Sequence, residues 1–431
     1  MTSSKVTLIY FFIAMYCLAS CASKDEESPA VTILTPAAGS IYQALDTVEV
    51  SFEAQDNNQL EWTSVKIVDE NFIPVSSVSV NEESGTLTNR FESVVLDDKS
   101  LQTGDYYVLV TASDGTNEQL EYTEIKIIAL PKKRLGIYFS DYVVGLPGRI
   151  FQVDSLFQNT LVWSQPNQDI RKLCVNSIKD QLTIIGHFST GIKNYNLLSG
   201  SEQWSDEVFS VAQTERFLDL VCLENSVFTA TYDRELRSYN SFGGLTMNIA
   251  TGIYRPESIY VNGDYIVVEM NLVGDNDRFI FVYNSSTRTL LWQLDVPMDV
   301  VSICSLRNDD EVLLFGNDGG NAKVLHYDIG ANAYWQPRQL PSGQLMDAAK
   351  TEGEKFVISH ADGIYLYTYS PNYLNLIEAG KVYQQVLFDE DKGTILGASN
   401  SSLEEFSLTG QLLNTVVHSD SITSFDIHYT R

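Results

Sequence analysis

The chain has 431 residues, with 56 Asp and Glu against 28 Lys and Arg, and its formal net charge is −28. A charge of this sign and size repels phosphate backbones, so we exclude nucleic acid as a partner. The same charge keeps a protein soluble and favours neutral or cationic ligands. The length predicts two or more domains.

Residues 1–20 have the three parts of a secretory signal. Lys5 gives a short positive start, an apolar run covers residues 6–16, and Leu18-Ala19-Ser20 suit a signal peptidase. The apolar run is shorter than the about 20 residues that span a bilayer as a helix. We therefore predict a signal peptide over residues 1–20.

The four residues Leu-Ala-Ser-Cys that end at Cys21 resemble the lipobox of bacterial lipoproteins. In that family the cysteine is acylated and becomes the N-terminus, and its acyl chains anchor the protein stably. The Lys-Asp-Glu-Glu that follows resembles the export tag of Bacteroidetes surface lipoproteins. The resemblance implies lipid attachment at Cys21, an acidic tether over 21–28, and an outer-membrane location facing outward. An ordinary secretory peptide with an accidental cysteine, and a merely flexible tether, are the alternatives.

Residues 29–130 alternate apolar and polar side chains in short runs separated by turn signals, as in TVEVSFEAQ and DYYVLVTAS. This pattern is typical of half-buried strands, and about seven of them in 100 residues predict a β-sandwich. The segment YYVLVTASDGTNEQLEYTEIKI resembles the last hairpin of bacterial Ig-like modules. The resemblance implies an Ig-like β-sandwich that acts as a spacer or adhesion domain.

The remaining residues, 131–431, repeat an apolar octet seven times. The octets are RLGIYFSD, QLTIIGHF, SVFTATYD, DYIVVEMN, EVLLFGND, KFVISHAD and GTILGASN. A period near 40 residues with several short strands per unit predicts a β-propeller. Because the first octet has no strand before it and residues 421–430 have no repeat of their own, we expect this last strand to complete the first blade. Seven blades then form a closed ring without an open edge.

Several repeats continue with an aromatic residue, a turn and a tryptophan, as in YNLLSGSEQW and YNSSTRTLLW. This pattern resembles the repeats of quinoprotein-like and WD40-like propellers. Quinoprotein dehydrogenases usually have eight blades, a vicinal disulfide and a calcium site, and this sequence has no adjacent cysteines. We therefore take the resemblance as one of fold alone and predict no cofactor.

Three cysteines, Cys174, Cys222 and Cys304, lie in short apolar segments of the second region. They are too few and too scattered for a disulfide framework or a zinc cluster. Their surroundings predict buried structural thiols.

Departures from the repeat indicate a ligand-binding rim. The connections at 140–149 and 270–278 are longer than their counterparts, and both join the second and third strands of a repeat. Loops on the central mouth of such a scaffold are a common binding place. We predict ligand-binding residues on this rim: His187, Arg234, Arg255, His360, Asp275 and Asp277.

Neither metal binding nor catalysis has a motif in this sequence. Asp275 and Asp277 can bind calcium, but they lack the ligand spacing of an EF-hand loop, and solvation of a surface loop is the simpler interpretation. The histidines have no partner nucleophile by motif, so we name no catalytic residue. We predict a cell-surface lipoprotein that binds an extracellular protein or glycan through its propeller. A propeller-type lyase or hydrolase acting on an extracellular polymer is the alternative.

Overall fold

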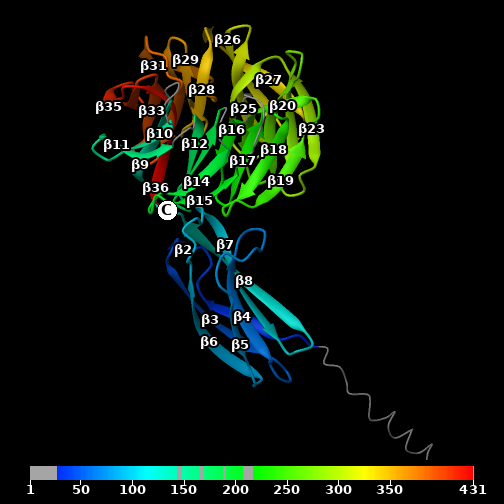
Figure 1. The fold of residues 1–431 in the computed structure, drawn as a ribbon. Helices are drawn as coiled ribbons and strands as arrows, with labels where there is room; N and C mark the ends of the chain where they lie inside the picture. Colours follow the sequence, from blue (N-terminus) through cyan, green and yellow to red (C-terminus); the bar gives the residue numbers. More distant parts are fainter. Residues whose placement is uncertain (1–26, 143–147, 166–168, 188–190, 207–216, 431) are drawn as a thin grey trace, which may run out of the picture. The chain divides into compact units, whose positions relative to one another are not determined.

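The computed structural model describes residues 27–142, 148–165, 169–187, 191–206 and 217–430. The predicted signal peptide and Cys21 lie outside these residues. The chain divides into two compact units, Met1–Pro131 and Lys132–Arg431. All regular structure in the described ranges is β-strand (Figure 1), and they contain no helix long and apolar enough to cross a membrane.

The first unit is built from two sheets. One sheet has three strands in the order β1-β3-β6, and the other has five in the order β2-β8-β7-β4-β5. Their bounds are β1 (Ala30–Thr35), β2 (Ser40–Gln43), β3 (Thr47–Gln55), β4 (Trp62–Val68), β5 (Ser79–Glu82), β6 (Leu87–Val95), β7 (Gly104–Ser113) and β8 (Glu118–Ile128). Both sheets contribute to one hydrophobic core, which includes Val50, Phe52, Val65, Val108 and Ile125.

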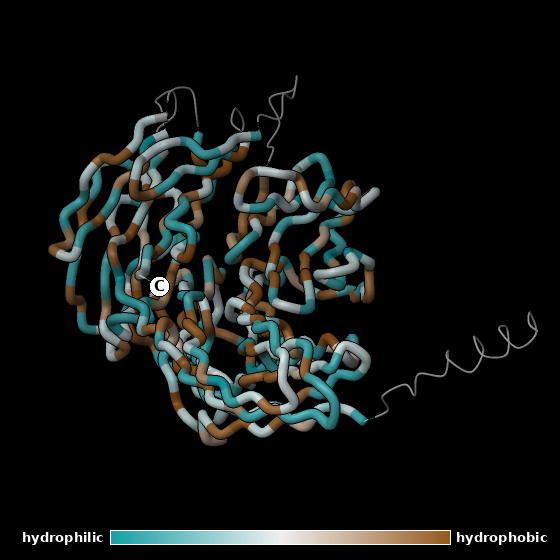
Figure 2. The backbone as a smooth tube through the Cα atoms, turned by 90° about the horizontal axis from the view of Figure 1, so that it is seen from below, coloured by the Kyte–Doolittle hydropathy of each residue, from teal (hydrophilic) through white to brown (hydrophobic). Residues whose placement is uncertain are grey.

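Strict alternation of side chains explains this core. In β3, Val48, Val50, Phe52 and Ala54 are buried and the residues between them point away. Successive side chains of a strand face opposite sides of the sheet, so one face of β3 lies on the core. The same alternation of apolar and polar residues is visible along the strands in Figure 2.

The described residues of the second unit form seven four-stranded antiparallel sheets. Six of them take their strands in chain order: β12 (Ile170–Asn176) to β15 (Glu202–Asp206), β16 (Phe217–Cys222) to β19 (Leu245–Ala250), β20 (Tyr254–Val261) to β23 (Leu290–Val296), β24 (Asp299–Ser305) to β27 (Ala333–Ser342), β28 (Leu345–Lys350) to β31 (Tyr373–Ala379), and β32 (Gln385–Asp389) to β35 (Leu412–Val417). The second and third strands of these sheets are β13 (Gln181–Gly186), β14 (Ile192–Asn196), β17 (Ser226–Thr231), β18 (Glu235–Asn240), β21 (Tyr265–Leu272), β22 (Arg278–Asn284), β25 (Glu311–Asp318), β26 (Asn321–Asp328), β29 (Lys355–His360), β30 (Gly363–Thr368), β33 (Thr394–Ser399) and β34 (Ser402–Ser407).

The seventh sheet joins the two ends of the second unit. Its order is β11-β10-β9-β36, from β9 (Lys133–Tyr142), β10 (Gly148–Val153), β11 (Asn159–Gln165) and β36 (Ser421–Thr430). The pairing that the sequence predicts between residues 421–430 and the first octet is present in the antiparallel β9–β36 ladder. Each octet coincides with the second strand of its sheet, counted from β36 in the seventh.

One end strand of each of the seven sheets contacts the corresponding strand of the next sheet in cyclic order, from β12 through β16, β20, β24, β28 and β32 to β36 and back to β12. We call these seven the innermost strands. A ring of four-stranded sheets around an axis is a β-propeller.

Side chains of the innermost strands join neighbouring sheets at every junction of this ring. Asp219 and Asp347 each accept the backbone N–H of the next innermost strand, from Ile259 at 2.8 Å and Val386 at 2.9 Å. The other five junctions are Ser424 with Leu173, Lys172 with Asp219, Ser258 with Val300, Ser302 with Ala348, and Gln385 with Phe425. Because these backbone groups lie inside the ring, the side chains satisfy donors and acceptors that would otherwise be buried without partners.

Cys174 and Cys222 form a disulfide between β12 and β16. The prediction of buried thiols is therefore wrong for these two residues, and it holds for Cys304, which is buried and free. The two cysteines are 48 residues apart in sequence, about one repeat, so the ring brings them to neighbouring strands.

Candidate functional site

The connections that carry the predicted ligand-binding residues lie on one rim of the second unit. In an antiparallel four-stranded sheet, the loop between the second and third strands lies at the same end as the exit of the fourth strand. The connections β21–β22, β23–β24 and β25–β26 therefore reach this rim together. We call it the loop rim.

A cavity of about 510 Å³ opens where these three connections meet, and we call it the rim cavity. Its lining includes three apolar residues, Val296, Pro297 and Met298, of which Pro297 is exposed. Its polar lining is acidic: Asp277, Asp295, Asp299 and Asp318, with Arg278, Asn276 and Asn317. A concave site in which polar groups converge beside apolar side chains is a common form of ligand site.

Arg278 is the one basic residue among those that line the rim cavity. Its guanidinium lies 2.5 Å from Glu257, 3.4 Å from Glu269 and 3.1 Å from Asp299. Glu257 also pairs with Arg255 at 2.5 Å. The positive charge of Arg278 is therefore already matched by carboxylates, whereas Asp277 and Asp295 are exposed to solvent. An anionic ligand would meet uncompensated negative charge there.

The two glutamates beneath the cavity have opposite pKa shifts. Burial opposes ionisation of Glu257, but hydrogen bonds from Arg278 and Arg255 outweigh it and hold the pKa of this carboxyl below its usual value. Burial raises the pKa of Glu269 well above the usual value, although it accepts the N–H of Val300 at 2.8 Å. The two pKa shifts differ because Glu257 has two arginines at 2.5 Å that stabilise its ionised form, whereas the arginine nearest Glu269 is 3.4 Å away.

The structure separates the six predicted binding residues. Asp277 lines the rim cavity, and Arg255 belongs to the ion-pair network beneath it. Arg255 also lies over the ring of Tyr232, with its guanidinium carbon 5.1 Å from the centroid. Asp275 is exposed in the same connection as Asp277 but is not part of the lining.

The other three predicted residues do not reach this cavity. His360 is fully buried and its Nδ1 bonds Asp362, so the imidazole does not face a ligand at the surface. Arg234 is exposed in the turn after β17 with a φ of 66°. His187 is half-buried after β13, and its backbone N–H donates to Asp169 O at 3.0 Å.

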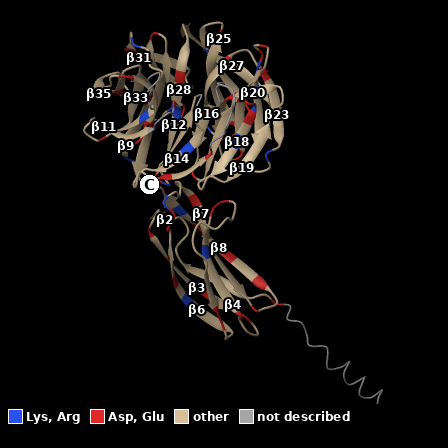
Figure 3. Cartoon of the chain, viewed as in Figure 1, with Lys and Arg blue, Asp and Glu red and all other residues tan. Residues whose placement is uncertain are grey.

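Sequence reasoning missed most of the lining. Arg278 lies at the end of the long 270–278 connection, and the length of this connection was the sequence feature that could have identified it as a lining residue. Asp295 lies near the end of β23 and Asp299 begins β24, and Glu257 and Glu269 come from β20 and β21. No spacing in the sequence distinguishes these four among the 56 acidic residues of the chain, and Figure 3 shows acidic residues on strands and loops of both units.

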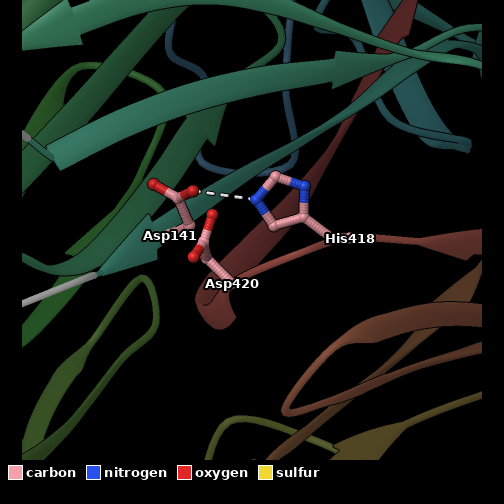
Figure 4. A group of neighbouring side chains, drawn as sticks. All are labelled: Asp141, His418 and Asp420. Carbon is pink, nitrogen blue, oxygen red and sulfur yellow. Dashed lines mark hydrogen bonds and ion pairs between the residues drawn. The ribbon is translucent and has the colours of Figure 1, made fainter.

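Among the residues that the structure describes, two groups of carboxylate and histidine side chains have the spacing of metal ligands: Glu257, Glu269 and Asp299, and Asp141, His418 and Asp420. In the second group, His418 Nε2 lies 2.8 Å from Asp141 Oδ2 (Figure 4). Arg149 pairs with both Asp141 and Asp420, just as Arg278 pairs with all three members of the first group. Each group thus already holds a guanidinium, and we assign no metal to either.

A second cavity, of about 270 Å³, lies on the ring axis and is lined by residues of all seven innermost strands. Lys172 pairs there with Asp219, and burial raises the pKa of Asp347 and of Asp426 to about 6 each. These groups also form the junction contacts described above. The axial cavity is therefore part of the scaffold.

No family model matches the sequence, and no curated protein matches it. Among solved structures, a protein from Lactobacillus plantarum is similar with a TM-score of 0.53 and 13% identity, over 69% of this chain and 100% of that one. Raptor from Chaetomium thermophilum is similar with a TM-score of 0.51 and 11% identity, over 62% and 26%. The Dos1 propeller has a TM-score of 0.45 and 10% identity, over 59% and 73%. At these identities the likeness concerns the fold alone.

Proposed function

We propose that the chain is a cell-surface lipoprotein, anchored through Cys21, with an Ig-like module followed by a seven-bladed propeller that binds an extracellular protein. The propeller takes a positively charged segment of that protein into the rim cavity. The lipobox-like and export-tag-like residues support the location. The Ig-like module spaces the propeller from the membrane.

The observation that carries this proposal is the charge of the rim cavity. Four aspartates line it. Asp299 pairs with Arg278 and Asp318 pairs with Lys323, so the exposed Asp277 and Asp295 supply the negative charge that a ligand would meet. The exposed Pro297 in the lining suits the methylene stem of a lysine or arginine, while the exposed Asp277 and Asp295 suit the charged head. Carboxylates select cations by repelling anions as well as by attracting the ligand.

A glycan is the alternative ligand for the rim cavity, and a lyase or hydrolase is the alternative function. No observation at the cavity favours catalysis over binding, because Asp299 pairs with Arg278 and Asp318 pairs with Lys323, and Asp277 and Asp295 are exposed to solvent. An enzyme would release product from a polymer, whereas a binding protein would retain the polymer unchanged.

Titration of the protein with decalysine and with decaglutamate peptides tests the proposal. We expect saturable binding of decalysine that weakens as salt is raised, because the contacts are ionic at a solvent-exposed mouth. Decaglutamate should not bind. Equal affinity for both peptides, or none for decalysine, would refute a cation-selective site.

The anchor has its own test. Mature protein should carry lipid and should be reachable by protease added to intact cells, and Cys21→Ala should abolish both. Lipid labelling that survives this substitution would contradict attachment at Cys21.

A further inference from the structure

Three aromatic side chains lie together on the outer face of the five-stranded sheet of the first unit. Tyr107 in β7 and Tyr122 in β8 have ring centroids 5.6 Å apart at 87°. Phe72, from the connection between β4 and β5, stacks on Tyr107 at 5.8 Å and 13°, and meets Tyr122 at 6.2 Å and 83°. We call Phe72, Tyr107 and Tyr122 the aromatic platform.

The platform belongs to the surface and not to the core. Tyr107 alternates along β7 with Tyr106 and Val108, which are core residues, so it points to the opposite face. Phe72 is 52% exposed and Tyr122 is 56% exposed. Two large aromatic rings left open side by side on a sheet face are a mark of a binding surface.

The backbone holds Phe72 in this place at a cost. Its φ is 60°, in the left-handed region that a bulky residue rarely adopts. Such a conformation is strained and persists where surrounding contacts impose it. Here Asp69 Oδ1 accepts the N–H groups of Asn71 at 2.9 Å and Ile73 at 2.8 Å, which bracket Phe72.

The exposed rings of Phe72 and Tyr122 form a right-angled corner. A pyranose ring fits such a corner, because its apolar C–H face stacks on one aromatic ring while its edge meets the other. Polar side chains stand beside it: Glu124 lies opposite Tyr107 in the ladder, and Lys66 lies opposite Leu109, which is opposite Tyr122. A carboxylate and an ammonium supply an acceptor and donors for sugar hydroxyls.

Charge selects among glycans. Residues 27–131 contain 18 Asp and Glu against 4 Lys and Arg, so sulfated or uronic-acid polymers are repelled. We propose that the first unit binds a neutral polysaccharide by stacking a pyranose ring on Phe72 and Tyr122. It is then a second binding module, in addition to a spacer, and its site shares no residue with the rim cavity.

Native gels cast with soluble starch, laminarin or galactomannan test this proposal on the full chain. We expect at least one of these neutral polysaccharides to retard the protein, and Phe72→Gly and Tyr122→Ala to reduce the retardation at least about tenfold. Phe72→Gly separates binding from folding, because glycine adopts a φ of 60° without strain. Its melting temperature should not fall.

The matched control is Phe91→Ala, which removes an equally exposed aromatic ring (67%) from β6 of the other sheet. It should leave retardation unchanged. Unretarded migration of the wild type in all three gels, or an equal loss with Phe91→Ala, would overturn the proposal. Variants of Asp277 and Asp295 should keep their retardation, so failure of the rim cavity and failure of the platform are distinguishable.

Discussion

Phe425, six residues from the C-terminus, lies directly opposite Phe139 in the ladder that joins β36 to β9. Both rings are fully buried, and they belong to one core cluster with residues of β33 and β34. The last strand of the chain therefore supplies the innermost strand of the sheet that begins the second unit (Figure 1).

Deleting residues 421–431 should unfold the second unit. The deletion removes Ile422, Phe425 and Ile427 from the core and leaves one edge of β9 unpaired. Each such side chain contributes roughly 1.5–3 kcal/mol when buried, and a domain is stable by only about 5–15 kcal/mol. Circular dichroism should show loss of the cooperative melting transition. An unchanged transition would contradict closure by β36.

Removing the disulfide should destabilise the same unit without preventing its folding. Cys174 and Cys222 join neighbouring innermost strands across 48 residues of sequence, and a native disulfide typically contributes about 2–5 kcal/mol. The Cys174→Ser/Cys222→Ser double variant should melt below the wild type, and reductant should lower the wild type toward it. Thiol counting in denaturant gives the control, since a reactive Cys174 before reduction would rule out the bond.

Two carboxyls at the ring axis should give the stability a pH dependence. Burial raises the pKa of Asp347 and of Asp426 from 3.8 to about 6 in the folded protein. Their stabilising contribution is complete below the unfolded pKa near 4 and is lost as pH rises through 6, because the folded state then gives up protons that it binds more tightly. A shift of this size corresponds to roughly 2–3 kcal/mol for each carboxyl.

The double variant Asp347→Asn/Asp426→Asn measures this effect. Its deficit in unfolding free energy relative to the wild type should be largest below pH 4 and should shrink as pH rises to 8. A deficit that is constant over this range would show that the two carboxyls titrate normally in the folded protein.

The fragment 27–131 should fold alone. Its two sheets share a core made only of residues from this unit, including Phe52, Leu60 and Ile125, so it has what an independent domain requires. A dispersed amide spectrum is the expected result. A collapsed spectrum with random-coil shifts would show that the fragment depends on the rest of the chain.

The strand pattern of this protein could be predicted because each octet has its own local signal. Apolar runs such as EVLLFGND and KFVISHAD are buried second strands, and their regular spacing also explains why residues 421–430 complete the sheet of β9. The signal here is periodic and local, and closing the ring adds only the condition that no edge stays open.

The contacts between repeats could not be predicted in the same way. Cys174 and Cys222 each lie in the first strand of adjacent repeats, but their offset along those strands decides whether the sulfurs meet. The long 270–278 connection pointed to Arg278, whereas its partners Glu257, Glu269 and Asp299 come from three different strands and no sequence signal joins them. Only the curvature of the ring brings such groups together.

The central claim is that the rim cavity binds a cationic segment, and its most direct test is a titration of decalysine into three proteins at one salt concentration. Asp277→Asn/Asp295→Asn removes two charges at the mouth of the rim cavity. Asp309→Asn/Glu352→Gln removes the same charge from exposed turns that join first and second strands, at the opposite rim. We predict at least about tenfold weaker binding for the first variant and wild-type affinity for the second. Equal weakening by both variants would mean that net charge alone attracts the peptide, and it would contradict a binding site in the rim cavity.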